Sequence, residues 1–492
     1  MHAKSNSVSS KHGKSAHIEL MVLDTPCIHT WGGVSAQDVT VSREIRLNTK
    51  MPRFKLLGKT GAGYAALRYG ESQMVFDLYN NRLNLKRSQT VKLNQAIYED
   101  AFVDAEGGWV LLHRPTKDSS TLAAVRLNNQ LQLQNEINVK LDAIPQSRRS
   151  PDGRYKVYQS EYGNAYVVLR SASNSSQLEQ VTIYDQRFES IASYSIIMNP
   201  EDRFNQILIT QSGDVYLLFT ENSDNPKPFI LYLAAEGSTS LVRHNVPMEA
   251  FPYHPGKIKY DAMQDKLIFA SLYSDRKEDE NYGATGLIHG YFDGQYWDLE
   301  EEEFSHNMLT DLTGQALRQS DNRLKTYYVN RIIPSALDSS YTLLMESFYS
   351  EEEQVFVPSV FATTTLSNYR TVELYYYNDI IALQRSPYYE VDDYAILRKS
   401  QLSENDNGRY SGIFLMNRRK ELSLLYTDAI TLDGNYNRFV LTGENVAKES
   451  LFNLGQKEVL PLTKLAQQTA VNECIMPSYV NNKMKLLKIT WF

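Results

Sequence analysis

The sequence predicts an all-β chain, a β-propeller of eight blades with seven as the alternative, whose closing blade is shared between N- and C-terminal strands. Three observations predict it. A sequence pattern of a tight turn followed by a short alternating strand, here called the phrase, recurs along the chain. No long helical period separates the strands, and both ends of the chain have unmatched strand pairs. Short alternating strands bounded by turn residues are typical of antiparallel sheets. Their recurrence in groups of roughly four indicates a propeller.

Each copy of the phrase is a tight turn followed by a run that alternates apolar and other residues. The clear copies begin at Gly61, Glu106, Pro151 and Gln211, and the weaker ones at Met263, Leu337, Arg418 and Val480. Seven turn residues mark the whole units: Gly63, Gly108, Gly153, Gly213, Asp265, Ser340 and Lys420. Most copies precede a second strand pair, such as MVFDLYNNRLNL from Met74, and NRFVL from Asn437 with KEVLPL from Lys457 forms a looser one. We therefore expect about four strands in each unit.

The two ends of the chain complement each other. The strand pair from His17 and Asp38 has no preceding phrase, and the pair from Asn472 and Lys483 has no following one. Together they complete one blade, which removes the exposed strand edges of an open ring. We expect a single domain over residues 18–492 after a disordered tail at residues 1–17; two separate β domains are the structural alternative.

Composition excludes two classes of protein. The 492 residues include 51 Lys and Arg against 58 Asp and Glu, a net charge of -7, which argues against a general nucleic-acid binder. No run approaches the ~18 apolar residues of a membrane span, so we expect no transmembrane segment. The shared blade brings Cys27 and Cys474 into one neighbourhood, either as a disulfide or, as we prefer, as two thiols.

Acidic residues form three clusters. The candidate binding residues among them are Glu300, Glu301, Glu302, Glu303, Glu351, Glu352 and Glu353, and a further cluster comprises Asp275, Glu278, Asp279 and Glu280. We predict acidic loop insertions near 275–285 and 350–371, with the cluster at 300–303 following an outermost strand, so that all three share one face. They are either solvated loops or a patch that attracts a basic partner or divalent cations.

A tyrosine-rich strand supplies the other candidates. Strand alternation places Tyr375 and Tyr377 on one sheet face and Tyr376 on the other. These rings could stack on a sugar or peptide, but packing between blades is the preferred interpretation. Asp379 follows directly and completes the candidate set.

This region resembles a group of uncharacterised β-propeller-like envelope or secreted proteins of the Bacteroidota. The resemblance is carried by Tyr377-Asn378-Asp379-Ile380-Ile381 and Arg398-Lys399-Ser400-Gln401, and it extends loosely through 410–428. Between the two segments this chain lacks the Gly-rich turn and Trp of the pattern. The resemblance implies an extracytoplasmic protein, in the periplasm or at the cell surface, if a leader was removed. Residues 1–17 lack the apolar segment of a signal peptide, so we expect a cytoplasmic protein if no leader was removed.

The chain lacks the GxSxG and HExxH motifs and the EF-hand loop, and its nine histidines show no ligand spacing outside the tail. We expect no cofactor and assign no metal. The predicted function is a non-enzymatic scaffold or recognition module of the cell envelope that binds a protein partner through a loop-bearing face. One alternative is a glycan hydrolase or lyase that uses carboxylates near the channel. Another is an accessory subunit of a secretion or gliding complex.

Overall fold

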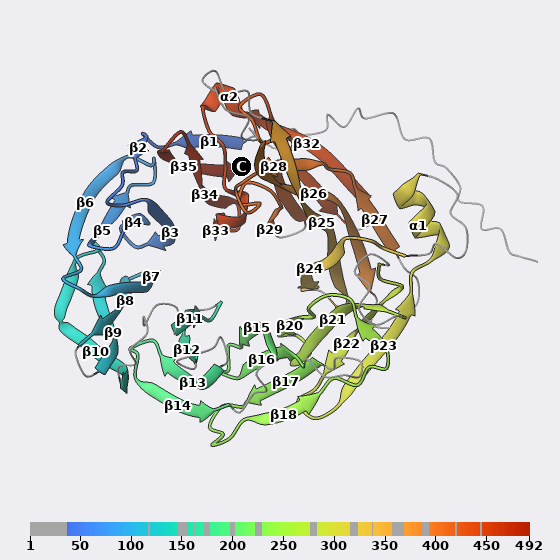
Figure 1. The fold of residues 1–492 in the computed structure, drawn as a ribbon, viewed down its shortest axis with the longest axis horizontal. Coiled ribbons are helices and arrows are strands. Elements are labelled where there is room, and N and C mark those ends of the chain that lie inside the picture. Colours follow the sequence, from blue (N-terminus) through green and yellow to red (C-terminus); the bar gives the residue numbers. More distant parts are fainter. Residues whose placement is uncertain are drawn as a thin grey trace, which may run out of the picture.

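A computed structural model describes most of the chain. The described residues are 37–116, 119–145, 155–161, 163–171, 178–196, 202–221, 229–275, 283–314, 323–336, 338–356, 369–385, 393–418, 421–442 and 445–492. Within these ranges the strands form eight antiparallel sheets of four or five strands, which Figure 1 shows arranged as a ring. The prediction of an all-β chain is confirmed.

Four sheets form the first half of the ring. The first contains β3 (Arg53–Thr60), β4 (Gly63–Tyr69), β5 (Gln73–Tyr79) and β6 (Leu85–Lys92). The second contains β7 (Ile97–Asp104), β8 (Gly107–Pro115), β9 (Ser119–Asn128) and β10 (Leu133–Pro145). The third contains β11 (Tyr155–Gln159), β12 (Ala165–Ser171), β13 (Leu178–Asp185) and β14 (Ser190–Ser195). The fourth contains β15 (Arg203–Ile209), β16 (Val215–Thr220), β17 (Phe229–Ala234) and β18 (Val242–Asn245).

Four further sheets complete the ring. The fifth contains β19 (Phe251–Pro252), β20 (Lys257–Asp261), β21 (Lys266–Ser274), β22 (Gly286–Phe292) and β23 (Trp297–Glu303). The sixth contains β24 (Tyr327–Pro334), β25 (Tyr341–Phe356), β26 (Tyr369–Arg385), β27 (Asp393–Leu397) and β28 (Gln401–Glu404). The seventh contains β29 (Phe414–Arg418), β30 (Glu421–Thr427), β31 (Asn435–Thr442) and β32 (Asn445–Asn453). The closing sheet contains β33 (Gln467–Ala470), β34 (Glu473–Val480), β35 (Lys483–Trp491), β1 (Gln37–Val41) and β2 (Ile45–Arg46).

Helices are few and short in the described residues. They are α1 (His306–Thr313), α2 (Leu454–Lys457) and the 3₁₀ turn η2 (Thr463–Leu465). None of the helices in the described ranges combines the length and apolar character that a bilayer span requires.

Turn residues set the strand boundaries inside each sheet. Gly63 begins β4 directly after the turn from β3, with a φ of 143°, and a Cβ at this position would lie 1.9 Å from the carbonyl oxygen of Tyr79. Only glycine combines this conformation with so close an approach of the neighbouring strand. The turn phrase recognised in the sequence thus has a direct steric cause in this sheet.

The hydrophobic core is divided among the gaps between consecutive sheets. Eight buried clusters each combine residues of two sheets that follow one another, such as Leu111 of β8 with Tyr166 of β12. The last cluster joins Tyr64 of β4 to Ile475 and Leu486 of the closing sheet. The first and closing sheets therefore pack against each other in the same way as the other consecutive sheets. Burial of apolar surface stabilises each of these contacts.

The closing sheet draws strands from both ends of the described chain, as the sequence predicts. β1 pairs with β35 from Gln37↔Trp491 to Val41↔Leu487, and β2 pairs with the same strand farther along. The C-terminal part supplies three strands rather than the expected two, because β33 adds to β34. The segment from His17 lies outside the described residues.

Two strand assignments need correction. The third unit was assigned its turn at Gly153, but the connection between β11 and β12 contains Gly163, with a φ of 68°, and YKVYQ after Gly153 is the first strand of its sheet. KEVLPL from Lys457 is not a strand, since the partner of β31 is β32. Lys420 lies outside the described residues.

Only Cys474, of the two cysteines, belongs to the described residues. Cys474 of β34 is fully buried, and burial raises the pKa of its thiol above the ordinary value. Cys27 lies outside the described residues, so the choice between a bridge and two thiols remains a prediction.

Candidate functional site

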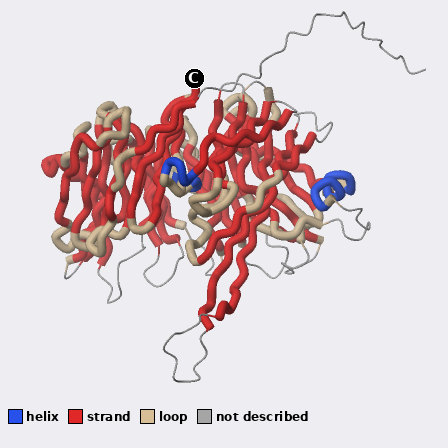
Figure 2. Tube along the Cα trace, turned by 90° about the horizontal axis from the view of Figure 1, so that it is seen from above, coloured by secondary structure: helices blue, strands red, loops and turns tan. Residues whose placement is uncertain are grey.

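A strand pair that projects from the ring contains the acidic residues Glu351, Glu352 and Glu353. β25 and β26 remain paired from Tyr349↔Tyr376 to Phe356↔Tyr369, and Figure 2 shows a pair of strands extending beyond the rest of the body. We call residues 349–356 and 369–376 the arm. Eight extended residues span about 27 Å. The segment predicted as a loop at 350–371 is thus strand over 350–356 and 369–371, and 357–368 lie outside the described residues.

The arm is acidic and ends in exposed apolar side chains. It contains four glutamates and one arginine, a net charge of -3, with Glu373 facing Glu352 across the two strands. The side chains of Glu351, Glu352 and Glu353 are exposed. At its far end Phe356 and Tyr369 are 56% and 59% exposed and pack edge to face. Like charges directly opposite each other destabilise a strand pair, so the arm breaks a rule of sheet design at this point.

The second acidic cluster lies in another sheet. Glu300, Glu301, Glu302 and Glu303 form the end of the outer strand β23, not a segment following it. Glu302 forms an ion pair with Arg385, and its carboxylate lies 3.5 Å from Nε2 of His289. Burial raises the pKa of Glu302, and burial together with Arg385 lowers that of His289 to about 3. Glu302 therefore belongs to the packing between the fifth and sixth sheets.

The third acidic cluster is only partly described. Asp275 forms an ion pair with Arg323 at 2.7 Å. Glu278, Asp279 and Glu280 lie outside the described residues.

The tyrosines divide between two faces as predicted. Tyr375 and Tyr377 are 7% and 6% exposed, whereas Tyr376 is half-buried and stacks on Tyr349 with ring centroids 4.5 Å apart. The Tyr375 hydroxyl donates to Oδ1 of Asn407 at 2.9 Å. The carboxylate of Glu373, together with burial, raises the pKa of Tyr375 to about 12. Tyr375 and Tyr377 are therefore buried in this structure, and their packing between blades stays a prediction.

Asp379 is engaged in the base of the arm. One of its carboxylate oxygens accepts from the backbone N–H of Lys399 at 3.0 Å, and the other pairs with Arg398 at 2.7 Å. The structure thus joins the two segments on which the family resemblance rests.

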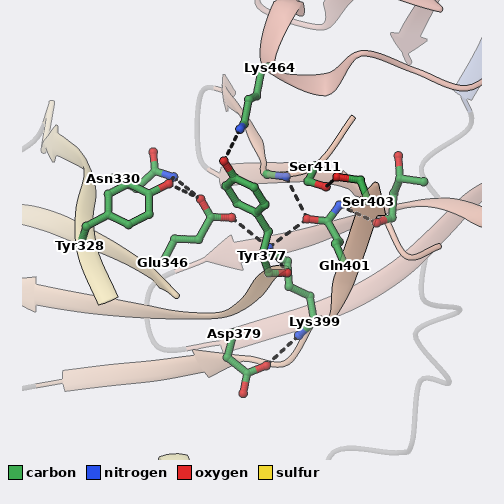
Figure 3. A network of polar contacts seen from close by, with 12 residues as sticks. Tyr328, Asn330, Glu346, Tyr377, Asp379, Lys399, Gln401, Ser403, Ser411 and Lys464 are labelled. Atoms are coloured by element: carbon green, nitrogen blue, oxygen red, sulfur yellow. Dashed lines mark hydrogen bonds and ion pairs between the residues drawn. The ribbon is translucent and has the colours of Figure 1, made fainter. Parts of the chain in front are cut away.

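A buried ion pair lies at the centre of this base. Glu346 of β25 and Lys399, which follows β27, approach to 2.9 Å with side chains 1% and 0% exposed. The carboxylate also accepts from the Tyr328 hydroxyl at 2.8 Å and from the Asn330 amide. Figure 3 shows these groups converging on Glu346. Burial lowers the pKa of Lys399, and Glu346 opposes that effect.

Further hydrogen bonds connect this pair to the start of the arm. Lys399 Nζ donates to the backbone oxygen of Tyr377 at 3.1 Å and to Oε1 of Gln401 at 3.0 Å. Gln401 in turn donates to the backbone oxygen of Thr427 in the seventh sheet at 2.7 Å. We call Tyr328, Asn330, Glu346, Tyr377, Lys399 and Gln401 the base network.

The base network also reaches the segment before the closing sheet. Lys464 of η2 lies 4.0 Å from the ring centroid of Tyr377 and donates to its hydroxyl at 2.6 Å (Figure 3). Burial lowers the pKa of Lys464, and Glu346 acts in the opposite direction. Groups from the sixth sheet, the seventh sheet and η2 therefore hold the point where β26 enters the arm.

Sequence reasoning missed this network, because Glu346 and Lys399 are 53 positions apart and share no motif. The available signal was the Lys-x-Gln pattern of Lys399 and Gln401, which was recognised as a resemblance without a role. The two side chains are in direct contact, since Lys399 Nζ donates to Oε1 of Gln401 at 3.0 Å.

A second polar arrangement has the contact order of a hydrolase triad. His113 Nδ1 lies 3.4 Å from the Glu99 carboxylate, and His113 Nε2 contacts the Ser120 hydroxyl. Ser120 is 2% exposed and His113 is fully buried, so a substrate carbonyl has no access to the hydroxyl in this structure.

One hollow lies near this arrangement, between the first and second sheets. It encloses about 680 Å³ and is lined by residues 49–50, 52–53, 69–72 and 97–99. Tyr69 and Tyr98 lie against each other there, with ring centroids 4.4 Å apart, and Glu71 and Glu99 supply carboxylates. Its volume is in the range of small-molecule sites. In the described part of the chain, no group of three metal-ligating side chains is placed to hold an ion.

Comparisons with known proteins give weak likenesses. No family model and no curated protein matches the chain. Similar solved structures include a member of the DUF4221 family from Bacteroides vulgatus, 10% identical with a TM-score of 0.33, covering 85% of this chain and 99% of that one. An uncharacterized protein from Listeria monocytogenes is 9% identical with a TM-score of 0.37, covering 84% and 86%. A polysaccharide lyase, an ulvan lyase, is 10% identical with a TM-score of 0.36, covering 80% and 90%. Likenesses at this level identify neither family nor activity.

Proposed function

We propose that this protein is a non-enzymatic recognition module in which a β-propeller scaffold presents the acidic arm to a basic protein partner. One observation carries the proposal. A strand pair with exposed glutamates leaves the ring at a point fixed by a buried polar network. Glutamates that served only to keep a sheet edge from aggregating would not need a buried polar network to fix the position of the strands that carry them.

The scaffold is an eight-bladed β-propeller in this proposal. Eight sheets and eight intervening clusters, the last joining the closing sheet to the first, support this assignment over seven blades. Propellers present loops and hairpins on their faces while the sheets stay rigid. The arm is such an extended hairpin.

Charge gives the arm its selectivity. A net charge of -3 concentrated on the arm attracts a basic partner and repels an acidic one. The matched comparison is a triple Glu→Gln variant at positions 351, 352 and 353 against a triple variant at positions 300, 301 and 303. Both remove three exposed negative charges, but only the first alters the arm.

The test measures binding of immobilised protein to an array of 12-residue peptides that differ in net charge. We expect basic peptides to bind, with the affinity falling about tenfold in the arm variant and falling as salt rises, while the β23 variant retains binding. Equal loss in both variants would show general charge attraction. Loss in the β23 variant alone would move the site to the fifth sheet.

The second candidate is a glycan-active enzyme, favoured by the hollow between the first two sheets. Aromatic rings and carboxylates in one concave site suit sugar binding and acid–base chemistry. Incubation with neutral and acidic polysaccharides, followed by assay of new chain ends, tests it. Activity that is lost in Glu71→Gln and Glu99→Gln would support this candidate, and no cleavage of any polysaccharide would reject it.

Location outside the cytoplasm is also a proposal, and it rests on the resemblance alone. The same resemblance suggests an accessory subunit of a secretion or gliding complex. Co-purification with a membrane complex from native envelopes supports that role, and recovery of the protein alone argues against it.

A further inference from the structure

Within the described part of the chain, one edge of the arm has no strand beside it. β24 pairs with β25 only from Tyr341 to Ser347, whereas β26 lies along the other edge of β25 as far as Phe356. From Tyr349 onward, none of the described strands pairs with the first edge. Its backbone N–H and C=O groups form a template for another strand.

The opposite edge of the arm is partly covered. β28 pairs with β26 from Leu374 to Tyr377, and Asn405 exchanges hydrogen bonds with Glu373 beyond it. The open template is therefore the β25 edge. Its sequence from Tyr349 to Phe356, YSEEEQVF, contains neither proline nor glycine.

The side chains beside this edge select the sign of charge. Successive residues point to opposite faces, so Glu352 lies with Glu373 on one face while Glu351 and Glu353 lie near Tyr376 on the other. The two opposed carboxylates repel each other, and a cationic side chain next to them would relieve that repulsion. An added acidic strand would increase it.

The tip adds an apolar contact. Val355, Phe356 and Tyr369 are exposed beyond the glutamates. A matching strand would carry lysine or arginine opposite the glutamates and an apolar or aromatic residue at one end. Because the base network fixes the root of the arm, little backbone freedom is lost there when a strand binds.

We propose that an extended basic segment of a partner protein adds as a strand to the free edge of β25 at residues 349–356. This inference rests on the proposed function and names the form of the partner. Main-chain hydrogen bonds provide affinity, and the glutamates provide selectivity.

The test separates strand addition from charge attraction. The probes are 12-residue peptides that alternate arginine or lysine with valine, threonine or tyrosine. Each is made unmodified and in two forms N-methylated at alternate residues, one for each edge of the peptide. Methylation removes backbone donors along one edge and leaves the charge unchanged. The binding partner is the whole protein, and affinity is measured by fluorescence anisotropy at 50 mM and 300 mM salt.

We expect one methylated form to bind at least tenfold more weakly than the other. We also expect slower hydrogen exchange at the amides of residues 349–356 when the unmodified peptide is bound. Equal binding by the two methylated forms, with loss in the arm Glu→Gln variant, would overturn strand addition and leave the proposed function standing. Absence of binding by every basic peptide would overturn the inference. Capture of a folded basic partner that depends on the arm glutamates would then still support the proposed function.

Discussion

Replacing Glu346 by glutamine tests whether the base network holds the arm. The change keeps the size and an oxygen acceptor of the side chain but removes the negative charge 2.9 Å from Lys399. The lysine side chain is 0% exposed, so its ammonium loses its counter-ion without gaining water. Breaking a buried pair on one side costs about 3–5 kcal/mol, and we expect the lower end because the amide oxygen still accepts a hydrogen bond.

The sign of the pH dependence makes this prediction specific. Burial already lowers the pKa of Lys399 in the folded protein, and loss of Glu346 removes the main opposing influence. A lysine whose pKa is lower folded than unfolded binds fewer protons in the folded state, so stability rises with pH up to its unfolded pKa. Each pH unit in that window is worth about 1.4 kcal/mol. The cost of Glu346→Gln should therefore be smaller at pH 9.5 than at pH 7.

Urea unfolding of wild type and variant at both pH values measures this difference, with tryptophan fluorescence as the signal. The double variant Glu346→Gln with Lys399→Met removes the buried charge altogether, so the extra pH dependence should vanish. Hydrogen exchange of β25 and β26 reports the local effect, and we expect faster exchange at the root of the arm. A cost below about 1 kcal/mol at pH 7, or one that is equal at both pH values, refutes the reasoning.

Three further predictions concern single residues. The pKa of His289 is about 3 in the folded protein and near 6.5 in the unfolded one, so the stability that the neutral ring contributes is present above pH 6.5 and is lost as pH falls below it. Between pH 7 and pH 4.5, His289→Gln should therefore lose about 2–3 kcal/mol less stability than wild type. Urea unfolding measures this difference, and equal losses would contradict the prediction. Trp491 is fully buried in the closing sheet, so Trp491→Ala should lower the free energy of unfolding by about 3–5 kcal/mol. Calorimetry should show this loss as a lower melting temperature. A loss under about 1 kcal/mol would mean that the packing of this sheet contributes little to stability. Glu352 faces Glu373, so Glu352→Gln should stabilise the strand pair of the arm by about 0.2–1 kcal/mol and slow hydrogen exchange of its amides accordingly. Faster exchange would show that the two carboxylates do not repel each other.

The sequence predicted the parts of the fold that depend on local alternation and turns. Gly63 and Gly108 lie at the start of the second strands of their sheets, and Gly213 lies in the connection between the first two strands, as the turn pattern predicted. The third unit was misassigned because the sequences around Gly153 and Gly163 both contain turn residues, and only strand pairing distinguishes them. A local pattern cannot supply that information.

The candidate site was less predictable from sequence. A run of three glutamates is disfavoured in strands, so 350–356 was predicted as a loop, yet pairing with β26 along the whole segment makes it a strand. Glu302 also escaped correct prediction, since its contact with Arg385 depends on the packing of two sheets. Tyr375 and Tyr377 were placed on one face correctly, because the pairing of β25 and β26 is regular from Tyr369 to Tyr377 and the two-residue period holds there.

The pairing of β1 with β35 also constrains when the protein can finish folding. Val39 pairs with Ile489, which lies 450 positions later in the polypeptide. At about 5–20 residues per second, a ribosome needs roughly 20–90 s to make the second after the first. During that interval β1 lacks its strand partner, and the ring cannot close until β35 has been made. A chaperone that shields this early strand would therefore act long before the last sheet exists.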